Sequence, residues 1–79
     1  MMGRLISIGY DNNINMDKVI SIVNAGSAPI KRLVRNARDE DMVVDATEGS
    51  KTASVIVMES GHIVLSSISS ETLRKRANT

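Results

Sequence analysis

TASVIVMESGHIVLSSI, residues 52–68, holds two apolar runs on either side of the dipeptide Ser60-Gly61. The first run extends from Thr52 to Met58 and the second from His62 to Ile68. Both runs are rich in β-branched residues, which favour strands, and a Ser-Gly dipeptide is typical of a tight turn. This stretch therefore predicts a β-hairpin.

Two further strands are predicted in the N-terminal part. Residues 4–9, RLISIG, end at a glycine, and residues 18–23, KVISIV, are again β-branched. Residues 11–17, DNNINMD, are expected to form a turn, because Asn and Asp tolerate left-handed backbone and hydrogen-bond to their own chain. Residues 24–26, NAG, form the next break.

A helix is predicted to begin after this break. Ser27 is its expected N-cap, and Pro29 falls in the first turn, where its missing N–H costs nothing. Apolar residues then recur at i, i+3, i+4 and i+7, the pattern of one buried helical stripe: Ile30, Leu33, Val34 and Ala37. The helix is expected to end near residues 39–41.

The remaining segments complete the order β-β-α-β-β-β-α. Residues 42–46 predict a short strand, and Ser69-Ser70 caps a short C-terminal helix whose last turns carry residues 74–76, RKR. The expected fold is α+β, with a small, mostly antiparallel five-stranded sheet and one main helix. One face or edge of such a sheet stays bare and is available for pairing with another copy of the chain.

Length and composition favour one domain, residues 1–79, that associates with itself. A chain of 79 residues buries only about 60% of its unfolded surface. Tyr10 is the only aromatic residue, so the core is aliphatic and thin. There is no cysteine for a disulfide, and one histidine without a thiolate cannot complete a structural zinc site. Self-association is then the expected source of further burial.

The net charge and the hydropathy of the chain exclude few classes of protein. The net charge of +1 argues neither for nor against nucleic acid. No apolar run approaches the ~18 residues that span a membrane. The N-terminus, MMGRLI, lacks the features of a secretory signal. We therefore expect a soluble, cytoplasmic protein with no membrane partner.

Signals of catalysis or metal binding are weak. His62, the only histidine, is expected at a turn as a surface residue. Residues 39–41, DED, could bind a cation together with Asp45, but their carboxylates point in different directions and loop solvation explains them. Residues 49–52, GSKT, lack the spacing of a phosphate-binding P-loop. No catalytic residue, metal ligand, cofactor or small-molecule substrate is predicted.

Basic residues give a limited argument for nucleic acid. Lys31, Arg35 and Arg38 share one helix face, either as a solvated face or as a phosphate-binding one. Residues 74–76 likewise either solubilise the C-terminal helix or contact phosphates. Lys18 follows an Asn-rich loop, and Lys51 lies beside hydroxyl residues whose O–H and N–H groups suit phosphate contacts. A lone tyrosine cannot provide the stacking platform that single-stranded binding needs.

The chain resembles the RemA family, named for the regulator of extracellular matrix genes, from about residue 4 to residue 73. The stretches SAPIKR (27–32) and DATxG (45–49) together are the specific part of this resemblance. It also rests on IGY (8–10), Asn15, VISIV (19–23), ARD (37–39), Thr52, VIVM (55–58) and ET (71–72).

The resemblance implies a compact subunit that closes into an octamer-like homo-oligomeric ring. It implies binding to double-stranded DNA, mainly through phosphates, and activation of biofilm matrix genes in bacteria. The DNA-contacting positions of the family fall on Lys18, Ser50 and Lys51. Head-to-tail contacts that close produce a ring, and a ring would repeat the two lysines as a basic track.

Two positions depart from the family. Position 50 is usually arginine and is Ser50 here, and position 53, often basic, is Ala53. A serine can donate to one phosphate oxygen but cannot neutralise charge or bind in a bidentate manner. The alternative is therefore a structural or protein-interaction ring with reduced DNA affinity. An enzyme with a site between subunits is the residual hypothesis.

Overall fold

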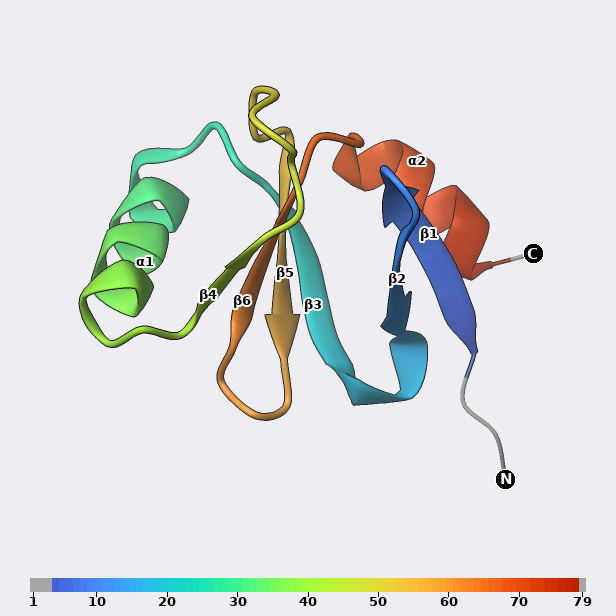
Figure 1. The fold of residues 1–79 in the computed structure, drawn as a ribbon, viewed down its shortest axis with the longest axis horizontal. Helices are drawn as coiled ribbons and strands as arrows, with labels where there is room; N and C mark the ends of the chain where they lie inside the picture. Colours follow the sequence, from blue (N-terminus) through green and yellow to red (C-terminus); the bar gives the residue numbers. More distant parts are fainter. Residues whose placement is uncertain (1–3, 79) are drawn as a thin grey trace.

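The computed structural model describes residues 4–78 (Figure 1). Met1–Gly3, on which the expectation of no secretory signal partly rests, lie outside this range. No helix in the described range is long and apolar enough to cross a membrane. The elements follow in the order β1 (Leu5–Gly9), β2 (Asn12–Asn15), the 3-10 turn η1 (Met16–Lys18), β3 (Val19–Asn24), α1 (Ala28–Asp39), β4 (Val43–Asp45), β5 (Ser54–Met58), β6 (Ile63–Ser66) and α2 (Ser70–Ala77).

A four-stranded sheet with the order β3-β5-β6-β4 forms the centre of the molecule. The predicted hairpin is confirmed: β5 and β6 are antiparallel and Val55 lies opposite Leu65. Gly61 in their connection has a φ of 93°, a backbone conformation that favours glycine. β3 pairs antiparallel with β5, whereas β4 pairs parallel with β6. The α+β class and the mostly antiparallel pairing are therefore as expected.

The N-terminal segment differs from the expectation of one five-stranded sheet. β1 pairs with β2 in a separate two-stranded sheet, so the prediction of a plain turn over residues 11–17 is wrong. Tyr10 and Asp11, with φ of 54° and 63°, form the two-residue connection. A hairpin of this type needs positive φ at both central positions. Asn12 supports it, because its side-chain amide donates to the Gly9 carbonyl over 3.2 Å.

Both faces of the central sheet are covered, so of the bare face or edge that was expected, only the edges formed by β3 and β4 remain. On one face, α1 packs against a cluster that contains Val55 and Leu65. On the other face, the β1–β2 hairpin and α2 enclose a second cluster that contains Ile56 and Val64. Figure 1 shows this arrangement, with α1 on one side of the sheet and the hairpin and α2 on the other. Strands buried on both faces carry continuous apolar runs, as β5 and β6 do.

Helix α1 begins and ends where the sequence predicts. The Ser27 side chain accepts a hydrogen bond from the Ile30 amide over 3.3 Å, and Glu40 is the C-cap. Ile30, Val34 and Ala37 pack against the sheet. Leu33, expected in the same stripe, is 37% exposed, because it lies at the margin of the helix face that contacts the sheet.

Helix α2 is fixed to β1 at several points. Leu73 is fully buried in the cluster under the hairpin. The Arg76 guanidinium donates to the Ser7 carbonyl over 2.8 Å. β1 is also bonded to the central sheet, because the buried Ser66 hydroxyl of β6 donates to the Ile8 carbonyl over 2.8 Å. These contacts determine where the turn that carries Tyr10 lies on the sheet.

Two hydrogen bonds from Thr47 to the side chain of Asp45 fix the course of the chain after β4. The Asp45 carboxylate accepts from the Thr47 amide at 2.9 Å and from the Thr47 hydroxyl at 2.6 Å. Both bonds lower the pKa of Asp45 from its usual value of 3.8, and the charge of Arg38 adds to the effect. Thr47 is itself buried. This pair directs the chain out of the sheet into the loop that precedes β5.

Truncation of Leu73 tests the docking of α2. Leu73→Ala removes a fully buried side chain and is expected to lower the free energy of unfolding by about 2–5 kcal/mol. Urea unfolding at one fixed protein concentration measures this change. The exposed neighbour is the control: Arg74→Ala is expected to change stability by less than about 0.5 kcal/mol. Equal effects of the two substitutions would contradict the packing described here.

The Asp45–Thr47 bond predicts a dependence of stability on pH. Because folding lowers the pKa of Asp45, its stabilisation is fully present above the unfolded pKa and is lost as pH falls through the folded pKa. Asp45→Asn is therefore expected to be less stable than the parent near neutral pH, with a difference that shrinks below about pH 4. Urea midpoints across this pH range check it. Thr47→Val, which removes the hydroxyl donor, is expected to reduce the same difference, and a difference independent of pH would refute the assignment.

Candidate nucleic-acid interface

A tight turn presents the loop that contains Ser50 and Lys51. The Ser50 amide donates to the Thr47 carbonyl over 2.9 Å. Between them, Glu48 and Gly49 both have positive φ, 51° and 84°, as in a type I′ turn. Glycine suits its position, whereas a glutamate in this conformation costs about 1 kcal/mol or more. Strain of this kind persists only where the surrounding structure holds it.

Tyr10 holds the turn from the other sheet. Its phenolic oxygen lies 2.7 Å from the Ser50 hydroxyl oxygen. Tyr10 itself belongs to the tight β1–β2 connection, so this bond joins two turns that are far apart in the sequence. The two hydroxyl groups carry two hydrogens and their shared bond uses one. The other hydrogen can be donated to a ligand at this surface.

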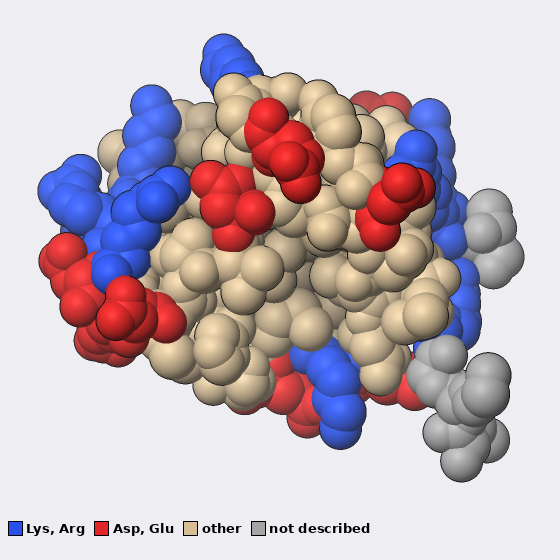
Figure 2. Space-filling model, viewed as in Figure 1, with Lys and Arg blue, Asp and Glu red and all other residues tan. Residues whose placement is uncertain are grey.

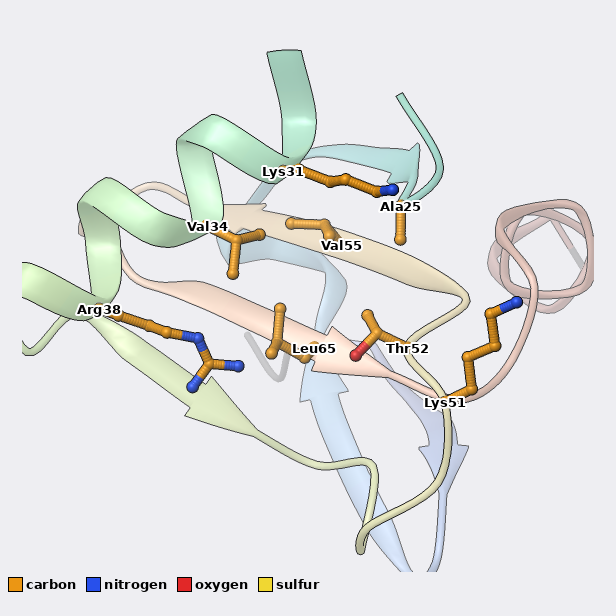
Figure 3. A pocket seen from close by; sticks show the side chains of 8 residues that line it. All are labelled: Ala25, Lys31, Val34, Arg38, Lys51, Thr52, Val55 and Leu65. Atoms are coloured by element: carbon orange, nitrogen blue, oxygen red, sulfur yellow. The ribbon is translucent and has the colours of Figure 1, made fainter. Parts of the chain in front are cut away.

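Lys51 directly follows Ser50 and shares a cleft with two cations of α1. Lys31 and Arg38 extend from α1 over the sheet and line the same cleft as Lys51 (Figure 3). Within residues 4–78, no carboxylate lies within ion-pair distance of any of these three cations. Of the three basic residues that the sequence places on one face of α1, Lys31 and Arg38 line the cleft and Arg35 does not.

Lys18 lies elsewhere. Lys18 directly precedes Val19, which pairs with Met58 at one end of β3. Lys51 lies three residues before Ser54, which pairs with Asn24 at the other end of β3. The length of β3, roughly 17 Å at 3.3 Å per residue, separates these two ends. The Lys18 ammonium is also 3.9 Å from the carboxylate of Glu59. The three residues predicted to contact DNA therefore form two groups, Ser50 with Lys51 and Lys18 alone.

The basic triplet of α2 is partly engaged within the chain. Lys75 pairs with Glu71 at 3.3 Å, and Arg76 bonds to β1. In Figure 2, Lys and Arg side chains gather mainly at the two ends of the long axis, over α1 and over α2. The surface between these two ends is mostly uncharged in this view, with several Asp and Glu side chains among the uncharged residues.

The residues considered for catalysis have local roles. The Nδ1 atom of His62 lies 2.7 Å from the Ser60 hydroxyl, within the β5–β6 connection. The Asp45 carboxylate accepts hydrogen bonds from the amide and the hydroxyl of Thr47. Among the described residues, no group of three or more His, Cys, Asp or Glu side chains is arranged to hold a metal ion.

Sequence reasoning missed Tyr10 as a neighbour of Ser50, and it missed the meeting of Lys31 and Arg38 with Lys51. Both depend on contacts between distant segments: the Tyr10–Ser50 bond spans 40 residues. The available signal was that the single aromatic residue falls directly after a glycine at the end of a predicted strand.

Comparison with known proteins identifies the relatives of this chain. A family model described as "RemA-like: Extracellular matrix regulatory protein A-like" matches residues 5–77. Extracellular matrix regulatory protein A of Bacillus subtilis (strain 168) is 49% identical over 73 residues, which cover 92% of this chain and 82% of that protein.

Other relatives carry similar names. A protein of Brevibacillus brevis named "Putative regulatory protein" is 47% identical over 76 residues, covering 96% of this chain and 88% of the relative. A protein of Lachnoclostridium phytofermentans with the same name is 48% identical over 77 residues, covering 98% and 85%. These names refer to regulation and none refers to an enzymatic activity. With a family model that matches nearly the whole chain, this protein belongs to the RemA-like family, the relatives of extracellular matrix regulatory protein A.

Proposed function

We propose that this protein is a cytoplasmic bacterial regulator that binds double-stranded DNA as a ring-shaped homo-oligomer, mainly through phosphates. By its resemblance to the RemA family, it would activate biofilm matrix genes. The observation that carries the proposal is the strained turn that presents Ser50 beside Lys51, held in place by Tyr10.

The chemistry of this turn suits a phosphate oxygen. Lys51 supplies a positive charge with no ion-pair partner among residues 4–78. One hydroxyl hydrogen of the Tyr10–Ser50 pair remains to be donated outward. Hydroxyl and ammonium donors are the usual contacts of the DNA backbone, and they position a protein without reading the sequence. Such contacts predict binding that tolerates different sequences and depends strongly on salt.

The separation of Lys18 from Lys51 supports assembly. One subunit carries these two lysines at opposite ends of β3, so a continuous basic track needs the Lys18 end of one subunit near the Lys51 end of another. β3 and β4 are the two edges of the sheet, and each carries an exposed aliphatic side chain: Ile20 is 65% exposed and Val44 is 50% exposed. Unlike edges that meet head to tail generate rings when the rotation closes.

A structural or protein-interaction ring with reduced DNA affinity is the second candidate. Two carboxylates favour it, because Glu48 lies in the turn itself and Glu59 pairs with Lys18. Ser50 replaces a charged residue of the family, which lowers the number of phosphates that each subunit can neutralise.

The role of Lys51 is tested by the salt dependence of DNA binding. We expect fluorescence anisotropy with a long AT-rich duplex to show binding at low salt that weakens steeply as salt rises. Lys51→Gln is expected to make the slope of log K against log salt less steep by about 0.9 for each phosphate that the variant no longer neutralises. Lys75→Gln, which removes the same charge from α2, is the matched control and is expected to retain the slope.

Absence of binding at low salt would overturn the DNA proposal, and so would equal effects of Lys51→Gln and Lys75→Gln. The ring is measured on the same protein without DNA by sedimentation velocity. A particle of several chain masses is expected, and a monomer at the concentrations used for binding would overturn the assembly.

Restoring the charge at position 50 separates the two candidate functions. Ser50→Arg is expected to tighten DNA binding and steepen its salt dependence, because an arginine in this turn can grip a phosphate with two hydrogen bonds. Asn36→Arg adds the same charge on an exposed position of α1 outside the turn and controls for net charge. If Ser50→Arg binds no better than the parent, the protein-interaction ring is the better account.

A further inference from the structure

A largely polar cavity lies where three strands of the central sheet begin or end. Asn24 is the last residue of β3, Ala53 precedes β5, and Ser67 follows β6. Main-chain hydrogen bonds hold these segments together, because the Ala25 amide donates to the Ala53 carbonyl over 3.2 Å and the Ala53 amide donates to the Ser66 carbonyl over 2.8 Å. The cavity encloses about 530 Å³. The fold thus gathers side chains from separate segments around one hollow in the surface.

Two lysines border this cavity from different segments. Lys31 belongs to the first turn of α1, and Lys51 belongs to the loop before β5. Among the described residues, no Asp or Glu side chain lines the cavity, and neither lysine lies within ion-pair distance of a carboxylate. Like charges gathered on a concave surface without acidic neighbours favour an anionic partner there.

The other polar side chains of the lining retain unused hydrogen-bond donors. The hydroxyls of Thr52 and Ser67 make no hydrogen bond within residues 4–78. The side-chain oxygen of Asn24 accepts from the Gly26 amide over 2.7 Å, which leaves the NH2 group of Asn24 as a donor. Hydroxyl, amide and ammonium groups are the usual donors to DNA phosphates. The lining therefore suits phosphate oxygens at more than one point.

The two lysines do not converge on one point. In Figure 3, Lys31 extends from α1 toward Ala25, whereas Lys51 is directed away from α1. A single small anion in contact with one ammonium therefore leaves the other unused. A DNA strand carries one phosphate for about every 3.4 Å of helix axis, so it can present different phosphates to the two lysines. We propose that this cavity takes the backbone of one DNA strand and that Lys31 is a further phosphate contact.

The inference rests on the DNA binding proposed above and specifies the path of the strand on the subunit. Ser50 and Lys51 lie at the strained turn, and Lys31 lies across the cavity on α1. The strand therefore passes from the turn to the first turn of α1. Arg35 and Arg38 do not line this cavity, so this path does not include them.

The salt dependence of DNA binding tests the role of Lys31. With the full chain and the long AT-rich duplex, Lys31→Gln is expected to make the slope of log K against log salt less steep by about 0.9 for each phosphate that it no longer neutralises. Arg35→Gln removes a charge from the same helix outside the cavity. It is the matched control and is expected to retain the slope, because its charge contacts no phosphate. Both side chains are exposed, so the fold is expected to tolerate both changes.

The double variant Lys31→Gln/Lys51→Gln distinguishes two phosphates from one. Because the two lysines contact different phosphates, the slope changes of the single variants are expected to add in the double variant. Inorganic phosphate at millimolar concentration and constant ionic strength is expected to change the Kd of the parent for DNA by less than about twofold, since one ion cannot engage both lysines.

If Lys51→Gln makes the slope less steep and Lys31→Gln does not, this inference is overturned and the DNA proposal stands. Equal effects of Lys31→Gln and Arg35→Gln would also overturn the inference, and so would a double variant with no more effect than one single variant. Competition by inorganic phosphate that Lys31→Gln abolishes would identify a site for a small anion instead. A parent protein that does not bind the duplex at low salt would overturn both the DNA proposal and this inference.

Discussion

Burial of the β5–β6 hairpin on both faces is the constraint on which the rest of the structure depends. Alternate residues of these strands point to opposite faces, so Val55 and Leu65 need a cover on one side and Ile56 and Val64 need one on the other. A chain with a single aromatic residue has only aliphatic side chains with which to meet this requirement. Helix α1 covers one face, and the β1–β2 hairpin with α2 covers the other (Figure 1).

Buried hydroxyl groups fix the position of these covers. Ser54 and Ser66 are fully buried in the central strands, and their hydroxyls donate to the carbonyls of Ile68 and Ile8. A buried hydroxyl without a partner is costly, so the bond to Ile8 favours one placement of the β1–β2 hairpin, and the bond to Ile68 favours one placement of the segment that leads to α2. The Tyr10 turn then lies within reach of Ser50, and the surface proposed for DNA follows from the same packing.

The surface chemistry depends on the same arrangement. Because α1 lies across the sheet beside the loop before β5, Lys31 and Arg38 line a cleft with Lys51. Lys51 thereby belongs both to the turn proposed for DNA and to this cleft. Lys18 lies at the far end of β3 beside Glu59, and a second subunit is the way to bring it near another Lys51. The proposed DNA contact and the proposed assembly therefore concern the same few cations.

The sequence by itself determined the local structure: the hairpin around Ser60-Gly61, the Ser27 cap and the limits of α1, and the order of the elements other than β2, because these follow from neighbouring residues. It also showed the resemblance to the family, through the stretches 27–32 and 45–49, and it singled out Ser50 and Lys51 as candidate DNA contacts. Only the tertiary structure decided that residues 12–15 form a strand, that both faces of the sheet are covered, and that Tyr10 meets Ser50. The physical reason is that these features are contacts between different segments, some of them tens of residues apart. Periodicity reports which face of an element is apolar but not which segment will cover it.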